Sequence, residues 1–166
     1  MTHTNDARIS LVEGKEQFAH ERFLATWEEA FARLRGRPRG LSPYLPLVQR
    51  LPWHTEHERG LREVPLRKIV GSVNRPDQFT AQLRPRSDLL RERWSRVYAA
   101  NLSSEGLPPI ELYQYGDNYY VRDGHHRCSV ARALGAREIQ AYVTELIGPE
   151  PATDGLPSME AKARGC

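Results

Sequence analysis

The sequence predicts an α+β fold that begins with a helical arm. Two stretches of helical periodicity, at residues 13–35 and 87–102, carry apolar residues at spacings of three and four. Short segments rich in β-branched and aromatic residues lie between and after them, where strands are expected. A Gly-Asp-Asn sequence at residues 116–118 joins two of these segments as a hairpin turn.

Composition narrows the class of protein. The 166 residues suit one domain with short additions. Lys and Arg number 24 and Asp and Glu 21, so the net charge of +3 is too small to establish a nucleic-acid partner by itself. No apolar run approaches the roughly 20 residues that span a bilayer, and residues 1–10 lack the order of a signal peptide. Two cysteines, Cys128 and Cys166, cannot form a disulfide framework, so we expect a reducing cytoplasmic environment.

The helix expected at residues 13–35 has an apolar stripe. Leu24, Trp27, Phe31 and Leu34 recur at spacings of three, four and three residues, and Phe23 and Ala30 widen the stripe. We expect this stripe to pack on a core, because the sustained heptads of a coiled coil are absent.

Residues 33–50 form a basic segment with five Arg and no acidic residue. Three Pro and two Gly prevent a continuous helix or strand there. Such a segment either contacts the phosphates of a nucleic acid or is a solvated linker. The candidate nucleic-acid contacts are Arg35, Arg37 and Arg39.

The middle of the chain is expected to hold a strand, a loop and a helix. Residues 61–73 are typical of a strand followed by a turn, with Pro65 marking an edge strand or a strand start. The loop at 74–86 adds three positive charges, on Arg75, Arg84 and Arg86. The helix at 87–102 has Ser87 or Asp88 as its cap. One side of this helix is apolar, with Leu90, Trp94, Val97 and Tyr98, and the other side carries Arg91, Arg93 and Arg96.

The last third is expected to form three strands and a helix. Segments 109–115 and 119–122 flank the hairpin turn, and the helix that follows runs to Leu134, where Gly135 ends it. Residues 138–146 alternate apolar and polar side chains, which predicts a strand with one buried face. Four hairpin tyrosines are expected to pack on the sheet, with base stacking as the alternative: Tyr113, Tyr115, Tyr119 and Tyr120.

A metal site is not predicted. His54 and His57 could share a helical face and bind zinc together with Glu58. A zinc site needs more ligands than this spacing supplies, so solvated polar residues are the expected outcome.

The residues between the second hairpin strand and the helix carry the chemistry: Asp123, Gly124, His125, His126 and Arg127. Glycine allows a sharp turn and the close approach of a ligand. The first N–H groups of a helix are unpaired and its dipole is positive there, which favours an anion. Arg127 can hold a phosphate with two parallel hydrogen bonds, and both histidines can donate. Asp123 can cap the helix, orient a histidine, hold Mg²⁺ through water or act as a base.

Residues 107–146, LPPIELYQYGDNYYVRDGHHRCSVARALGAREIQAYVTEL, resemble the signature half of the ParB/sulfiredoxin superfamily. The upstream VPLRKIVGSV resembles its first strand and the loop after it, so the resemblance covers about residues 61–147. It implies a ParB/sulfiredoxin-like small mixed sheet flanked by helices. The chain then divides into a helical and basic arm at 1–60, this domain at 61–147 and a flexible tail at 148–166.

The turn resembles three branches of the superfamily to different extents. ParB partition proteins have Gly-Glu-Arg-Arg and bind CTP there, which Gly124 and Arg127 match. Sulfiredoxins have Gly-Cys-His-Arg and bind ATP, and here His125 stands at the nucleophilic cysteine, which argues against sulfinic reductase activity. Free-serine kinases have Asp-Gly-His-His-Arg, which matches all five positions. Their catalytic Glu after the first strand is replaced here by Gly-Ser-Val-Asn-Arg, with Asp77 the nearest acid.

The leading hypothesis is a nucleotide-binding domain for ATP or CTP, with Mg²⁺. The resemblance implies phosphate binding by Gly124, His126 and Arg127, and it makes Asp123 and His125 the catalytic candidates for hydrolysis or transfer of the terminal phosphate. The alternatives are a DNA-binding regulatory module without catalysis and a ParB-like metal-dependent nuclease. The roughly 20 residues after Leu146 are too few for the helix-turn-helix domain of ParB proteins. Enzymatic activity and oligomeric state stay open, and no membrane partner is expected.

Overall fold

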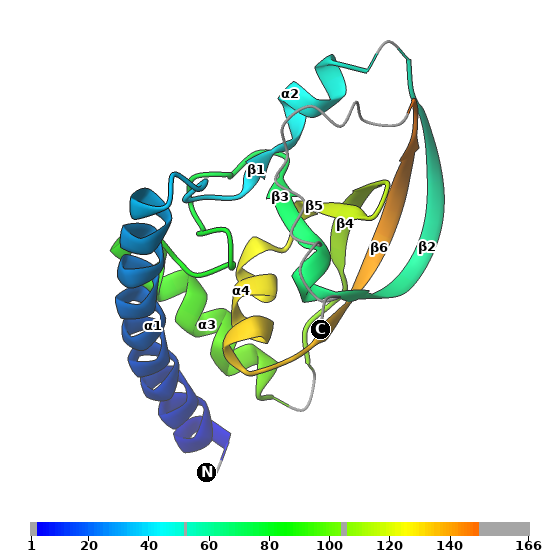
Figure 1. Cartoon of the computed structure of the whole chain (residues 1–166). Coiled ribbons are helices and arrows are strands. Elements are labelled where there is room, and N and C mark those ends of the chain that lie inside the picture. The colour runs from blue at the N-terminus through cyan, green and yellow to red at the C-terminus, as the bar shows by residue number, and fades with distance from the viewer. Residues whose placement is uncertain (1–2, 52, 104–105, 150–166) are drawn as a thin grey trace, which may run out of the picture.

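A computed structural model describes residues 3–51, 53–103 and 106–149 of the chain. The architecture is α+β, with a six-stranded mixed sheet and helices packed against it (Figure 1). The helices are α1 (His3–Leu34), α2 (Tyr44–Gln49), α3 (Arg91–Asn101) and α4 (His125–Ala133). The strands are β1 (Ser42–Pro43), β2 (Thr55–Pro65), β3 (Ile69–Ser72), β4 (Ile110–Tyr115), β5 (Asn118–Asp123) and β6 (Glu138–Ile147). Two short 3-10 turns are η1 (Leu66–Lys68) and η2 (Asp88–Leu90).

The strand order across the sheet is β1-β3-β5-β4-β6-β2. The pairs β1–β3, β3–β5 and β4–β6 are parallel, whereas β4–β5 and β2–β6 are antiparallel. The predicted hairpin is confirmed: Tyr115 pairs with Asn118 across a two-residue turn, and Gly116 has a φ of 57°. A mixed sheet of this kind places the carboxyl ends of β3 and β5 side by side, because those two strands are parallel.

Each face of the sheet has its own core. Under α4 the core is aliphatic, with Ile110, Leu112, Val121 and Val143 among its buried members. On the opposite face, Tyr44 of α2 packs with tyrosines of the hairpin, and its ring stacks on that of Tyr113 at 4.9 Å. The expectation that the hairpin tyrosines pack on the sheet is therefore confirmed.

On the other side from α2, the remaining helices form successive layers, with α4 next to the sheet, α3 beside α4 and α1 outermost against α3 (Figure 1). Trp94 of α3 is fully buried, lies edge-on to Phe18 of α1 at 5.7 Å and donates its indole N–H to Ser129 of α4 at 2.9 Å. Ser87 caps the preceding turn by accepting from the backbone N–H of Leu89. The predicted apolar side of this helix is thus the buried side.

The buried face of α1 differs from the predicted stripe. Phe18, Glu21 and Ala25 face the protein, whereas Trp27 and Phe31 are more than half exposed. Glu21, Glu28 and Glu29 on the same side form ion pairs with arginines of the 79–86 loop and of α4. These ion pairs fix the orientation of the helix. The prediction was wrong because periodicity shows which residues share a face, not which face meets the domain.

The first half of the sheet differs from the expectation in two ways. Residues 61–73 form the end of β2, a 3-10 turn and β3, and not a single strand with a turn. His57 lies on β2, so the helical face suggested for zinc does not exist. Pro65 ends β2 at the edge of the sheet, as its missing N–H group predicts. The strand β1 and half of β2 lie in residues assigned to the arm; the three-part division stays a prediction, and residues 150–166 of the tail lie outside the described residues.

Within the described ranges, no helix combines the length and the apolar character that crossing a bilayer requires. The expected cytoplasmic location stays a prediction.

Candidate functional site

The predicted strand-turn-helix is present where β5 meets α4. Gly124 precedes the first helical residue with a φ of 101°, a conformation that L side chains rarely adopt. A Cβ atom at this position would lie 2.4 Å from Cγ2 of Ile110, so the space is closed as well. Both constraints select glycine, and they place His125 and His126 at the first turn of α4.

A cavity of about 130 Å³ lies at this helix start. Its charged lining residues are Arg75, Arg93, Arg122, Asp123 and Arg127. Four cations against one carboxylate give the cavity a surplus of positive charge next to the positive end of the helix dipole. The sequence predicted one of these four arginines as a site residue, and the structure adds three.

His125 is buried and held from two sides. Its Nε2 lies 2.7 Å from Oγ of Ser72 at the end of β3, and that oxygen also accepts the backbone N–H of Arg75 at 2.9 Å. Phe79 stacks on the imidazole with the ring centroids 6.1 Å apart. Burial, helped by the nearby charge of Arg75, lowers the pKa of His125 to about 4. The ring is therefore neutral at pH 7, with one N–H to donate.

His126 has a buried nitrogen without a partner. Within the part of the chain that the structure describes, its Nε2 makes no hydrogen bond. Burial first, and then the charge of Arg93, lowers the pKa of His126 to about 4, so this ring is neutral as well. An unsatisfied buried polar group costs about 1–3 kcal/mol. A ligand oxygen that accepted a hydrogen bond from this ring would remove that cost.

Arg127 is largely engaged within the protein. One terminal nitrogen donates to the carbonyl oxygens of Pro108 and Pro109, each at 2.7 Å, and the other pairs with the carboxylate of Asp123. These bonds tie the loop before β4 to the turn after β5. Two of the predicted site residues, Asp123 and Arg127, thus bind one another.

The other three arginines of the cavity come from elements that lie far apart in the sequence. Arg93 of α3 makes no hydrogen bond or ion pair among the described residues, and the guanidinium of Arg75 donates to the side-chain amide oxygen of Gln78 at 3.3 Å and has no carboxylate partner among them. Arg122 of β5 lies 3.5 Å from the carboxylate of Glu111, with both side chains about half exposed. Charge in the loop and on the polar side of the helix was visible in the sequence, but no spacing rule brings these elements to one cavity.

Cys128 follows the turn inside α4 and is fully buried. Burial raises the pKa of its thiol to about 12, so the reactive thiolate is not formed at neutral pH. It is a core residue beneath the sheet-facing side of the helix.

The donors at the cavity fit an anion better than a metal ion. Among the described residues, no group of three or more His, Cys, Asp or Glu side chains could hold a metal. Asp123 is the single carboxylate lining the cavity, and it is paired with Arg127.

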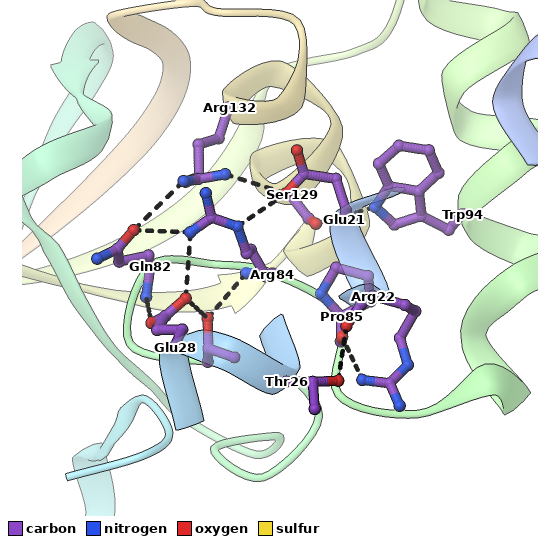
Figure 2. Close-up of polar contacts among 11 residues, drawn as sticks. Glu21, Arg22, Thr26, Glu28, Gln82, Arg84, Pro85, Trp94, Ser129 and Arg132 are labelled. Carbon is purple, nitrogen blue, oxygen red and sulfur yellow. Dashed lines mark hydrogen bonds and ion pairs between the residues drawn. The ribbon is translucent and has the colours of Figure 1, made fainter. Parts of the chain in front are cut away.

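A second charged cluster lies along the other side of α4 and is internally balanced (Figure 2). Glu21 of α1 lies 3.1 Å from Arg84 and 3.2 Å from Arg132, and Arg84 also pairs with Glu28 at 3.2 Å. Thr80 and Gln82 donate to the Glu28 carboxylate. Arg84 and Arg132 therefore serve the packing of α1 and are not left free to bind phosphates.

The predicted nucleic-acid residues lie apart from the cavity. Arg35, Arg37 and Arg39 follow the end of α1, are exposed, and make no ion pair with any described residue. Their role stays a prediction.

A larger cavity of about 560 Å³ lies at the opposite end of α4. Leu66, Ile69 and Leu83 are among its lining residues, with Arg132 and Glu138 at the end of the helix and the start of β6. It is bigger than the cavity at Gly124, but it lacks histidine, cysteine or an unpaired buried polar atom among its lining residues. Chemistry rather than size therefore selects the smaller one.

No family model and no curated protein matches this chain. Among solved structures, sulfiredoxin from Arabidopsis thaliana is similar at 23% sequence identity and a TM-score of 0.38, over 50% of this chain and 82% of that one. A likeness at this level carries no argument about activity. The α+β architecture rests on the sheet and helices described above, and the superfamily resemblance of residues 61–147 stays a prediction.

Proposed function

We propose that the cavity at the start of α4 binds the phosphates of a nucleotide, ATP or CTP. The observation that carries the proposal is the convergence of unneutralised arginines on two buried, neutral histidines at a helix N-terminus. Helix N-terminal N–H groups and arginine side chains are the donors that phosphate groups use in proteins.

Each residue has a separate task in this proposal. Gly124 lets the ligand approach the backbone, and His126 donates a hydrogen bond to a phosphate oxygen. Arg75, in the loop after β3, and Arg93, on α3, neutralise the charge of the phosphate. Arg127 stabilises the turn through its ion pair with Asp123. The sequence predicted that Arg127 holds the phosphate. In this proposal Arg75 and Arg93 do so, because they have no carboxylate partner among the described residues.

The size of the cavity limits what enters it. Pockets that enclose a whole small molecule usually measure about 300–1,000 Å³, against about 130 Å³ here. The phosphates would fill the cavity and the nucleoside would lie outside it. The proposed phosphate binding does not require Mg²⁺, because Asp123, the carboxylate at the cavity, is engaged with Arg127.

The proposal is for binding, with catalysis as a second step to be tested. Asp123 and His125 are the acid-base candidates, but a pKa of about 4 makes His125 a weak base at neutral pH. Its contact with Ser72 suits a positioning role as well as a chemical one.

Calorimetric titration of the full chain with ATP, CTP and inorganic triphosphate tests the proposal. We expect binding of a nucleotide, displaced by triphosphate, with affinity about tenfold or more weaker in Arg93→Ala, since a charge-assisted hydrogen bond contributes about 1.5–3 kcal/mol. The matched control is Arg96→Ala, because Arg96 lies on the same helix and does not line the cavity. Absence of binding by the wild type, or equal losses in both variants, would overturn the proposal.

A DNA-binding module is the second candidate, favoured by one observation. Arg35, Arg37 and Arg39 are exposed and make no ion pair with a described acidic residue, whereas Arg84 and Arg86 pair with carboxylates of α1. Anisotropy measurements with labelled duplex and single-stranded DNA at low salt test it. We expect binding that weakens steeply with salt and is lost when the three residues are changed to Ala. No complex at low salt would remove this candidate.

A further inference from the structure

The outward face of α1 is apolar over its C-terminal half. Four large side chains there are more than half exposed: Phe23, Trp27, Phe31 and Leu34. Their spacings of four, four and three residues place them on one side of the helix. The rings of Phe23 and Phe31 each lie 6.3 Å from that of Trp27, so the surface is continuous. We call these four residues the aromatic face.

The aromatic face is larger than the isolated apolar residues that any protein surface carries. Aromatic side chains have about 150–250 Å² each, so three half-exposed rings and Leu34 offer about 400 Å² of apolar surface. The opposite side of α1 is already packed on α3 and the 79–86 loop (Figure 1). The largest exposed apolar patch on a folded monomer has about this size and is often a functional surface.

The exposed charges along α1 and the segment directly after it differ in sign from one end to the other. Glu13 and Glu16 are exposed on the N-terminal side of the aromatic face and make no ion pair among the described residues. On its C-terminal side, Arg33, Arg35 and Arg37 are exposed and equally without a described carboxylate partner. From α1 into the segment after it, the order is therefore acidic, apolar, basic.

This order is self-complementary about Trp27. Phe23 and Phe31 lie four residues before and after it, so a two-fold axis at Trp27 sets one ring against the other. Glu16 lies eleven residues before Trp27, and Arg37 and Arg39 lie ten and twelve residues after it. The same axis brings the acidic part of one α1 toward the basic segment that follows Leu34 in a second copy, which is the pattern of an isologous interface.

We propose that α1 pairs antiparallel with α1 of a second copy of this chain, with the two-fold axis at Trp27. The pairing covers the aromatic face and supplies carboxylates to a basic segment that has none of its own. Two apolar faces of this size, with their charged flanks, approach the lower end of specific interfaces, about 1,200 Å² in total. The dimer is accordingly reversible, and its affinity falls with added salt.

Sedimentation velocity of the full chain over a wide concentration range tests the pairing. We expect a monomer-dimer equilibrium, and in Trp27→Ala a dissociation constant raised at least about tenfold, as for a central aromatic hot spot. The control is Leu89→Ala, because Leu89 is 93% exposed and lies outside the aromatic face. Circular dichroism checks that the variants stay folded. A monomer at every concentration, a larger open assembly, or equal behaviour of both variants would overturn the proposal, as would a monomer that binds lipid vesicles through this face.

Charge reversal tests the orientation. In Glu16→Arg, and separately in the double variant Arg37→Glu with Arg39→Glu, the self-pairing meets like charges and weakens. Mixed together, the two variants should form a heterodimer as tight as the wild-type dimer, because each end then meets the opposite charge. Native mass spectrometry counts the species. Undisturbed homodimers of either variant, or no preference for the mixed pair, would overturn the antiparallel arrangement.

Discussion

Two charged clusters next to α4 differ in how their charges are satisfied. Along the side that faces α1, Glu21 and Glu28 balance Arg84 and Arg132, and each charged group has an opposite charge within 3.2 Å. At the N-terminal end, four arginines line a cavity with one carboxylate. The first cluster is complete without a ligand, and the second is not.

This difference separates structural charges from candidate binding charges. Removing one partner of a buried pair leaves the other uncompensated, so a balanced cluster can be disturbed only at a cost in stability. Surplus cations next to two neutral histidines can instead accept an anion without breaking a contact. Counting unpaired charges around a cavity is therefore more informative here than counting basic residues in the sequence.

The largest effect is expected from breaking the balanced cluster. Glu21→Gln leaves Arg84 and Arg132 partly buried with less negative charge, which should lower the free energy of unfolding by about 3–5 kcal/mol. Urea unfolding measures it, with Glu92→Gln as the control, since the exposed pair with Lys15 contributes at most about 1 kcal/mol. Anion binding at α4 should be retained. A loss no greater than that of the control would mean that the cluster is not structural.

The two buried histidines of the unbalanced cluster should make the free energy of unfolding depend on pH. Both histidines have folded pKa values of about 4 against 6.5 in the unfolded chain, so the unfolded state binds more protons between these values. The free energy of unfolding is therefore highest above pH 6.5 with respect to these two groups. It falls as the pH drops toward 4, by up to about 3 kcal/mol for each histidine. Unfolding free energies across this range should decline less steeply in His126→Gln than in the wild type. Parallel declines would show that His126 is not held neutral by burial.

The backbone at the turn gives the next effect. In Gly124→Ala the new Cβ meets Ile110 and the residue keeps a left-handed conformation, for a combined loss of about 2–3 kcal/mol. Gly135→Ala is the matched control, since Gly135 has a φ of 80° and open space around it. Thermal or urea unfolding should show the larger loss at Gly124. Equal losses would mean that the contact with Ile110 relaxes freely.

Local signals in the sequence predicted local structure well. The hairpin at Gly116, the cap at Ser87 and the helix stop at Gly135 depend on neighbouring residues, and all three are present. The orientation of α1 depends on Glu21 and Glu28 meeting residues more than 50 positions away, which periodicity cannot reveal.

The candidate site divides in the same way. The turn and its two histidines were visible as a sequence motif, and the predicted sharp turn at Gly124 is present. Arg75 reaches the cavity from the loop after β3 and Arg93 from α3, while Ser72 at the end of β3 contacts His125 behind it. Nothing in the neighbouring sequence of these three residues distinguishes them. That Arg127 binds Asp123 and the two prolines could be learned only from the packing of the loop before β4.

The smallest effect distinguishes a structural Asp123 from a catalytic one. Its carboxylate is 62% exposed and is the negative charge at the cavity, so Asp123→Asn removes a screened repulsion toward a bound phosphate. We expect nucleotide or triphosphate affinity to rise by up to about fivefold, the equivalent of a surface ion pair of at most about 1 kcal/mol. Calorimetric titration measures the affinity, and Glu111→Gln, which removes the partner of Arg122 beside the cavity, should change it in the same direction. If Asp123 instead held a metal ion or acted as a base, Asp123→Asn would lose metal-dependent binding or turnover, whereas Glu111→Gln would not. That result would assign different roles to the two carboxylates.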